Sequence, residues 1–343
     1  SITSLAAYDL KGRLLWTFGE PGRVERHTTC DLCFQVHDLD GDGRAEVYFC
    51  RDFEFFVAEG ATGRVLRNAA LPRHPSGDGR KLYRLMGDSI LFCDLTGSGR
   101  PDSILLKDRY RYAWACDKDL RQRWLFAGNT GHYPFARDVN GDGRDEIMLG
   151  YHLLDSAGRE LWAADFPDHA DNVAIVDLHD GGKATGPAAP RVLAAASDAG
   201  FYILDLEGRV RVHYPIGHAQ SMCVARLRPG DEMQIVVNTF WGAAGITAFF
   251  DEAGRLLRDC EPMPYACLLQ PVNWVPARAA SPPADLVLLS THPRQGGLMD
   301  GFGNRVLSFP DDGHPTLCSD ARDLDGDGID EILTVSYTHL RAH

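Results

Sequence analysis

The sequence lacks the long apolar stretch that a transmembrane helix requires, because no run of roughly 18 or more apolar residues occurs in it. It is also short of positive charge: 35 lysine and arginine residues stand against 48 aspartate and glutamate residues, giving a net charge of −13. That balance argues against nucleic acid as a partner. Patterns with a helical period are essentially missing as well. We therefore expect an all-β protein with no membrane partner and no nucleic-acid partner.

The nine cysteines are scattered and form no recognisable disulfide framework. Most lie inside apolar segments, as Cys50, Cys93 and Cys223 do, which favours buried thiols. Cys30 and Cys33 have no second pair at zinc spacing, so we predict no zinc site. The thiols favour a reducing compartment, whereas the acidic loops described next favour secretion. The given chain begins at Ser1 and has no signal peptide, so we leave its localisation unassigned.

Three nearly identical acidic loops stand out in the sequence. The central loop begins at Asp138, with oxygen-bearing side chains at Asn140 and Asp142 and a carboxylate at Glu146. A hard cation such as Ca²⁺ requires oxygen ligands at this spacing, and glycine between them allows the backbone to curl. The apolar residues that follow indicate a strand, unlike the helix of an EF-hand. We therefore predict Ca²⁺ as a cofactor that serves mainly to fasten the loops.

The predicted metal ligands form three sets at equivalent positions. They are Asp38, Asp40, Asp42 and Glu46; Asp138, Asn140, Asp142 and Glu146; and Asp323, Asp325, Asp327 and Glu331. A degenerate copy runs from Asp94 to Asp102, with Thr96 and Ser98 in place of two of the acids.

These loops belong to a repeat of seven units. Equivalent positions before each apolar strand are Glu46, Asp102, Glu146, Arg191, Gln234, Asp285 and Glu331, which are 56, 44, 45, 43, 51 and 46 residues apart. Such a period is typical of propeller blades. We predict a seven-bladed β-propeller forming a single domain over residues 1–335, with calcium loops on one face. Residues 336–343 form a tail outside the pattern, and 181–190 read as a surface insertion.

Each unit also carries a hairpin signature, Asp-x-x-Gly-Arg between two strands, as in Asp155–Arg159. A version without glycine occurs at Asp117–Leu120. The first hairpin, at Tyr8–Trp16, precedes every acidic loop, and the last loop has no hairpin after it. We therefore expect the N-terminal and C-terminal strands to pair and close the propeller. The tryptophans of the outer strands, such as Trp16 and Trp162, are interpreted as packing residues.

Histidines recur at one phase of the repeat, where the chain enters each inner strand: His132, His169, His218 and His314. Turns expected on the same face add Arg109, Arg111, Tyr151, His152, Trp241, His292 and Arg294. Aromatic rings stack on sugars, arginine pairs with carboxylates, and histidine transfers protons near neutral pH, so these residues suit an anionic sugar. Alternatively, the histidines cap turns or were duplicated together with the blades, without a function.

Several of these motifs resemble the propeller of rhamnogalacturonan lyases. The resemblance runs from Trp124 through Gly128–His132, then Asp138–Ile147 and Leu154–Trp162 to His169, and it is clearest over residues 30–180. It implies calcium loops and cleavage of an acidic pectin backbone by β-elimination. That family looks eight-bladed, whereas seven units are counted here. Seven blades are closer to related lyases acting on ulvan or on rhamnose–glucuronate linkages, which use histidine and tyrosine for proton transfer and arginine or a metal for neutralisation.

Our first hypothesis is accordingly a polysaccharide lyase acting on a rhamnose- and uronate-containing glycan, and we expect it to be a monomer. The predicted catalytic residues are His132, His169, His218, Tyr151 and Arg109. The predicted substrate-binding residues are Arg111, His152, Trp241, His292, Arg294 and His314, with Arg294 as a second candidate for neutralising the uronate.

Two other classes of function fit the same sequence. One is a non-catalytic, calcium-stabilised propeller that binds a glycan or a protein, since cation loops of this kind occur in such proteins. The other is a glycoside hydrolase, for which Asp168 and Asp171 are the candidate carboxylates.

Overall fold

The regular structure of this chain is entirely β in the part that the computed structural model describes. That part comprises residues 2–21, 31, 33–73, 87–179, 187–230, 232–240, 245–261, 268–274, 286–290, 296–309 and 316–336. It contains antiparallel sheets throughout and no helix long and apolar enough to span a bilayer. The chain divides into two compact units, Ser1–Asp165 and Phe166–Arg341. The all-β expectation is confirmed.

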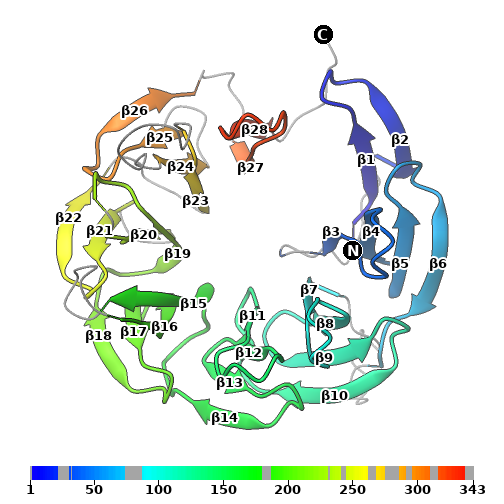
Figure 1. Cartoon of the computed structure of the whole chain (residues 1–343), viewed down its shortest axis with the longest axis horizontal. Helices are drawn as coiled ribbons and strands as arrows, with labels where there is room; N and C mark the ends of the chain where they lie inside the picture. Colours follow the sequence, from blue (N-terminus) through cyan, green and yellow to red (C-terminus); the bar gives the residue numbers. More distant parts are fainter. Residues whose placement is uncertain are drawn as a thin grey trace. The chain divides into compact units, whose positions relative to one another are not determined.

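Unit 1 contains one two-stranded sheet and three four-stranded sheets, each with its strands side by side (Figure 1). Its strands are β1 (Ser4–Tyr8) and β2 (Leu14–Gly19); β3 (Phe34–His37), β4 (Glu46–Arg51), β5 (Glu54–Glu59) and β6 (Val65–Ala70); β7 (Ser89–Cys93), β8 (Ser103–Lys107), β9 (Tyr112–Asp117) and β10 (Gln122–Ala127); and β11 (Phe135–Arg137), β12 (Glu146–Leu149), β13 (His152–Leu154) and β14 (Glu160–Ala163).

Unit 2 contains three four-stranded sheets and one two-stranded sheet. Its strands are β15 (Asn172–His179), β16 (Ala188–Ala195), β17 (Phe201–Leu204) and β18 (Val210–Tyr214); β19 (Ala219–Ala225), β20 (Gln234–Thr239), β21 (Thr247–Asp251) and β22 (Leu256–Cys260); β23 (Leu268–Val272), β24 (Leu286–Ser290), β25 (Gly297–Met299) and β26 (Arg305–Ser308); and β27 (Thr316–Arg322) and β28 (Glu331–Ser336).

The sheets follow the predicted repeat, because strands pair in sequence order within each of them. The predicted closure would join the β1–β2 sheet of one unit to the β27–β28 sheet of the other. That closure, the count of seven blades and the single domain over 1–335 stay predictions. Strand β28 reaches Ser336, and residues 337–343 of the predicted tail lie outside the described residues.

The predicted insertion at 181–190 is corrected at its C-terminal end. Strand β16 begins at Ala188, which pairs with His179, and Pro190 pairs with Asp177. Proline is tolerated there because β16 pairs with β17 only from Val192 onward, so Pro190 lies where the strand has a single partner.

The hairpin signature forms the turn that its residues predict. In the β13–β14 hairpin, Asp155 Oδ1 accepts the backbone N–H groups of Ala157 and Arg159 at 3.0 and 2.9 Å, and Gly158 has a φ of +78°. In the version without glycine, Leu120 adopts a φ of +60°, a conformation that costs a non-glycine residue about 1 kcal/mol. Its side chain packs against the core of unit 1, which offsets that cost.

The core consists of clusters that join neighbouring sheets. Within β8, Ile104 and Leu106 contact the cluster shared with the preceding sheet, whereas Leu105, between them, belongs to the cluster shared with the following sheet. Alternate side chains of a strand point to opposite faces, so a strand buried on both faces reads as a continuous apolar run. Cys50, Cys93 and Cys223 are buried thiols, as predicted, and Cys116 is buried as well. Burial raises the pKa of Cys50, Cys93 and Cys116.

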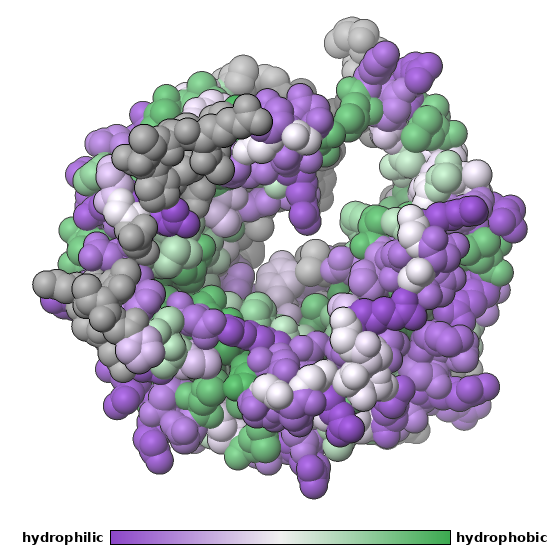
Figure 2. Space-filling view, viewed as in Figure 1, coloured by the Kyte–Doolittle hydropathy of each residue, from purple (hydrophilic) through white to green (hydrophobic). Residues whose placement is uncertain are grey.

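One predicted packing residue also links two sheets. Trp16 of β2 lies against the turn at Gly63, and its indole N–H donates to the carbonyl of Gly60 at 2.9 Å. Outside the core, hydrophilic side chains cover most of the visible surface, and hydrophobic residues form separate small patches (Figure 2). Scattered patches of this kind are ordinary for a folded protein.

Candidate functional site

The first acidic loop precedes β4 and is held by its own backbone. Asp38 accepts hydrogen bonds from the backbone N–H groups of Gly41 and Gly43 at 2.7 and 2.9 Å, and both glycines have positive φ. Against the opposing effect of desolvation, these donors hold the pKa of Asp38 below its usual value. The carboxylates of Asp38, Asp40 and Asp42 each offer an oxygen within 4.8 Å of the others. Oxygen donors this close together fit a hard cation.

The other two complete loops have the same geometry. Asp138 accepts from Gly141 N at 2.7 Å, and Asp323 accepts from Gly326 N at 2.7 Å. The acid that ends each loop folds back onto the backbone: Glu146 accepts from Val139 N, and Glu331 accepts from Leu324 N. In the last loop, Asp323, Asp325 and Glu331 form a second cluster able to hold a metal ion.

Repulsion among the acids is visible in the central loop. Burial raises the pKa of Glu146, and the negative charges of Asp142 and Asp138 raise it further, whereas the hydrogen bond from Val139 opposes them. A bound cation would relieve this repulsion, so the residues of the loop fit the group that the motif implies.

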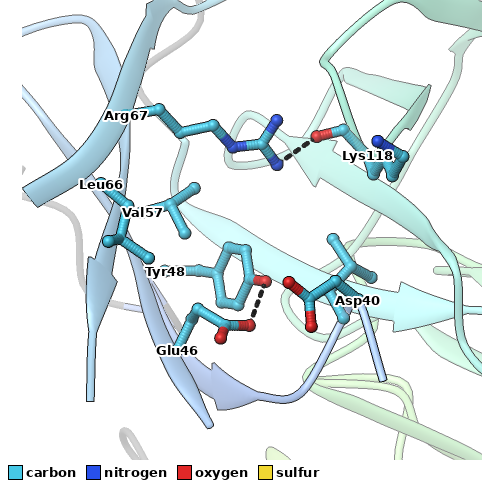
Figure 3. Close-up of a pocket in the computed structure, with 8 residues that line it drawn as sticks. Asp40, Glu46, Tyr48, Val57, Leu66, Arg67 and Lys118 are labelled. Atoms are coloured by element: carbon cyan, nitrogen blue, oxygen red, sulfur yellow. Dashed lines mark hydrogen bonds between the residues drawn. The ribbon is translucent and has the colours of Figure 1, made fainter. Parts of the chain in front are cut away.

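The acid of the first loop has a different partner. Glu46 accepts a hydrogen bond from the hydroxyl of Tyr48 at 3.0 Å, and both residues are buried. The two side chains line a cavity of about 240 Å³ beside the loop, where Asp40 also points toward them (Figure 3). Above them in this view, Arg67 donates to the carbonyl of Lys118. The cavity therefore combines carboxylates on one side with basic side chains on the other.

The degenerate loop keeps the same shape without the same acids. Asp94 accepts from the backbone N–H groups of Gly97 and Gly99, each at 2.7 Å. Thr96 and Asp102 stand at the positions that Asp40 and Glu46 have in the first loop. The Thr96 hydroxyl donates to the Asp102 carboxylate at 2.5 Å. The loop thus keeps the backbone hydrogen bonds of the acidic loops with fewer acids.

In unit 1 the predicted residues Arg109 and His132 belong to one network. Arg109 Nε donates to the hydroxyl of Tyr110 at 3.0 Å, and that hydroxyl lies 3.1 Å from Nε2 of His132. His132 Nδ1 lies 2.7 Å from Asp31 Oδ1. The carboxylate of Asp31 also pairs with the buried ammonium of Lys107, 3.7 Å away. Arg109 is exposed, so the network reaches the surface.

The other predicted residues of unit 1 lie elsewhere. Tyr151 is 3% exposed and follows β12, and its carbonyl accepts from Ala164 N. His152 pairs with Glu160 of the neighbouring strand at 2.7 Å. The exposed Arg111 follows Asp108, whose carboxylate caps the turn by accepting the Arg111 N–H at 2.9 Å. Each of these three therefore has a structural contact of its own.

In unit 2 the predicted histidines His169 and His218 converge on Asp171, which is 1% exposed. His218 Nε2 lies 3.3 Å from Asp171 Oδ2, and His169 Nε2 lies 3.7 Å from Oδ1. Gln220 donates to the same carboxylate at 2.7 Å, and Ser197 donates to it as well. The hydrolase alternative named Asp171 as a candidate; the structure makes it a buried carboxylate that accepts from Gln220 and Ser197.

His218 has a second carboxylate partner. Its Nδ1 lies 2.6 Å from Oδ1 of the exposed Asp198. The hydrogen bond with Asp171, supported by Asp198 and opposed by desolvation, raises the pKa of His218 to about 9. His218 is therefore a cation near neutral pH and is suited to donate a proton or to attract an anion. The second carboxylate named by the hydrolase alternative, Asp168, pairs with His169 at 2.6 Å.

Four predicted residues, Trp241, His292, Arg294 and His314, lie outside the described residues. Sequence reasoning did not select Asp31, Lys107, Tyr110 or Asp198. Lys107 carried a usable signal, because a lysine ends the otherwise apolar run of β8. Asp31 carried none, since it lies 101 residues before His132 in the chain.

The comparisons with known proteins point to one group. No protein-family model matches the chain. The rhamnogalacturonan exolyase YesX of Bacillus subtilis (strain 168) is 28% identical over an alignment of 225 positions, and the match covers 50% of this chain and 36% of YesX. The rhamnogalacturonan endolyase YesW of the same organism is 28% identical over an alignment of 233 positions, and the match covers 51% of this chain and 36% of YesW. The matched segment thus spans about a third of each curated relative.

The fold is similar to that of solved rhamnogalacturonan lyases. The crystal structure of YesX has a TM-score of 0.66 at 22% identity, covering 92% of this chain and 60% of that one. The Bacillus licheniformis rhamnogalacturonan lyase PL11 has a TM-score of 0.66 at 18% identity, covering 97% of this chain and 63% of that one. The resemblance to rhamnogalacturonan lyases stated from the sequence is confirmed.

Proposed function

We propose that this chain is the β-propeller part of a polysaccharide lyase that cleaves a rhamnose- and uronate-containing acidic glycan by β-elimination. Sequence similarity to two rhamnogalacturonan lyases and a shared fold support the substrate class. The observation that carries the proposal is the network of unit 1, in which the exposed Arg109 and the histidine His132 meet at one hydroxyl. Acidic sugar elimination requires a cation and a proton-transfer group in such proximity.

The elimination requires three contributions from the protein. A positive charge must neutralise the uronate carboxylate, because this makes the C5 hydrogen more acidic, and we assign that role to Arg109. A base must remove the C5 hydrogen, and an acid must protonate the leaving oxygen at C4.

We also propose that Ca²⁺ occupies the acidic loops and that the sheets form a closed, seven-bladed propeller. The carboxylate clusters at Asp38 and Asp323 are the ligands we expect to hold the ion. When bound, the ion would supply fixed positive charge and fasten the loop to the strand after it. No catalytic step is assigned to it.

The proposed activity has a direct test. Elimination leaves a double bond between C4 and C5 of the uronate, which absorbs in the ultraviolet. Purified protein that is folded by circular dichroism would be mixed, with Ca²⁺, with a panel of rhamnogalacturonan, ulvan and rhamnose–glucuronate polymers. A rise in absorbance on one of them is expected. New reducing ends without that absorbance would indicate a hydrolase, and neither signal would indicate a binding protein.

A matched pair of histidine variants separates chemistry from folding. His132→Ala should reduce the rate by about a hundredfold or more. His213→Ala should leave the rate unchanged, because His213 is exposed on β18, where its ring stacks on Tyr202 and its Nε2 lies 2.8 Å from the carbonyl of Ala199. Equal rates in the two variants would contradict the proposed role of His132.

A further inference from the structure

The network of unit 1 leads from the protein interior to the surface. Lys107 is fully buried, and the side chains of Asp31 and His132 are 1% and 11% exposed. Tyr110 is half-buried, and Arg109, which donates to it, is exposed. Within this network, Tyr110 thus lies between the exposed Arg109 and His132, whose side chain is largely buried.

The contact with Asp31 orients the imidazole of His132. Burial disfavours the charge on Asp31, but its hydrogen bond with His132 and the positive charge of Lys107 hold its pKa below the usual value. An ionised carboxylate only accepts hydrogen bonds, so the proton of the imidazole lies on Nδ1, which faces Asp31. In the neutral form of this imidazole, the Nε2 atom is an acceptor for the hydroxyl of Tyr110.

The outer part favours ionisation of the same hydroxyl. Arg109 Nε donates to the oxygen of Tyr110, and its guanidinium lies over the Tyr110 ring, 5.3 Å from the centroid. A permanently charged donor stabilises the anionic form of the oxygen that accepts from it. Tyr110 thus has a proton acceptor on one side and a cation on the other, which is the arrangement of an activated side chain.

We propose that Tyr110 removes the C5 hydrogen of the uronate, with Asp31 and Lys107 as positioning residues that act through His132. The proposal rests on the proposed lyase function and names its base. The hydroxyl proton passes to Nε2 of His132, and the phenolate oxygen takes the C5 hydrogen. The electron pair of that C–H bond forms the C4–C5 double bond. The C4–O bond breaks, and its electron pair leaves with the glycosidic oxygen, which an acid protonates.

Tyr110 suits this role better than Tyr151, the tyrosine selected from the sequence. Tyr151 is 3% exposed, whereas Tyr110 is partly exposed and contacts both His132 and Arg109. A base must come within hydrogen-bonding distance of the hydrogen that it removes, so access to the substrate decides between the two.

A titration that does not depend on catalysis tests the activation. The tyrosinate absorbance of the wild type and of Tyr110→Phe would be recorded against pH, and the difference assigned to Tyr110. We expect ionisation below the ordinary value of about 10. Ionisation at or above that value would overturn the proposal.

Kinetics test the assignment itself. Tyr110→Phe should lower kcat by about a hundredfold or more with KM within about twofold, because only the transferred proton is lost. Tyr112→Phe is the matched control: its ring packs against Trp114, and activity should be unchanged. Asp31→Asn should lower kcat with little effect on KM and should shift the pH profile, which a purely structural role would not do.

Wild-type protein without product overturns the lyase function and this assignment together. An active wild type with an equally active Tyr110→Phe overturns the assignment alone.

Discussion

The indole of Trp124 on β10 lies over Gly158, in the hairpin turn of the following sheet. A Cβ atom at Gly158 would lie 2.6 Å from Cδ2 of Trp124, and the indole N–H donates to the carbonyl of Ser156 at 3.0 Å. The same contact occurs between Trp16 of β2 and Gly63, in the hairpin turn between β5 and β6. The glycine of the hairpin signature therefore has two roles: it allows the left-handed turn, and it leaves space for the tryptophan of the preceding sheet.

This double role can be separated by two alanine substitutions. Gly158→Ala should destabilise the protein by about 2–4 kcal/mol, because it adds a steric clash to the cost of a positive φ. Gly12→Ala lies in the equivalent turn of the β1–β2 hairpin, where Gly12 has a φ of +75° and no atom within 4 Å, and it should cost only about 1 kcal/mol. Urea unfolding would measure both values. Equal losses would show that the contact with Trp124 does not contribute.

Removal of the cation should lower the stability of the folded state. Ca²⁺ at about a hundred times its dissociation constant adds about 3 kcal/mol per occupied site, so Tm should fall when a chelator is added. Asp42→Ala should remove part of this difference. Ser98→Ala, at the equivalent position of the degenerate loop, should keep all of it. The same Tm with Ca²⁺ and with chelator would contradict a stabilising role.

His218 should make stability depend on pH in the alkaline range. Its pKa is raised from 6.5 to about 9 in the folded protein, so the folded state binds the proton more tightly than the unfolded state does. Its contribution is fully present below about pH 6.5 and is lost as the pH rises through about 9. It should amount to about 2–3 kcal/mol. His218→Gln should flatten this part of the urea-unfolding profile, whereas His213→Gln should leave it unchanged.

Replacing one partner of the buried ion pair of unit 1 should cost more stability than replacing both partners. Lys107→Met leaves the carboxylate of Asp31 buried without that cation and should cost about 3–5 kcal/mol. Adding Asp31→Asn should recover part of the loss. Lys118→Met, at an exposed ion pair with Asp119, should cost at most about 1 kcal/mol. A double variant no more stable than Lys107→Met would argue against the charge as the cause.

Local signals made most of the fold predictable. The turn at Asp155–Arg159 and the loop at Asp138 depend on residues within a few positions of one another, so their patterns can be read directly. The site was less predictable, because its contacts are distant in the chain. His132 was selected from its phase in the repeat, but its partner Asp31 lies 101 residues away. Leu120 shows another limit, since tertiary packing maintains a turn there without the glycine that the pattern requires.

The loop at Asp94 keeps the turn of the acidic loops with fewer acids, which bears on how such proteins change over time. Because backbone groups donate to Asp94 as they do to Asp38, we expect single acids of a loop to be exchangeable without loss of the turn. Each loop can then differ from the others in how much divalent cation it requires. A lineage that moves between calcium-rich and calcium-poor surroundings could adjust that requirement loop by loop, leaving the sheets as they are.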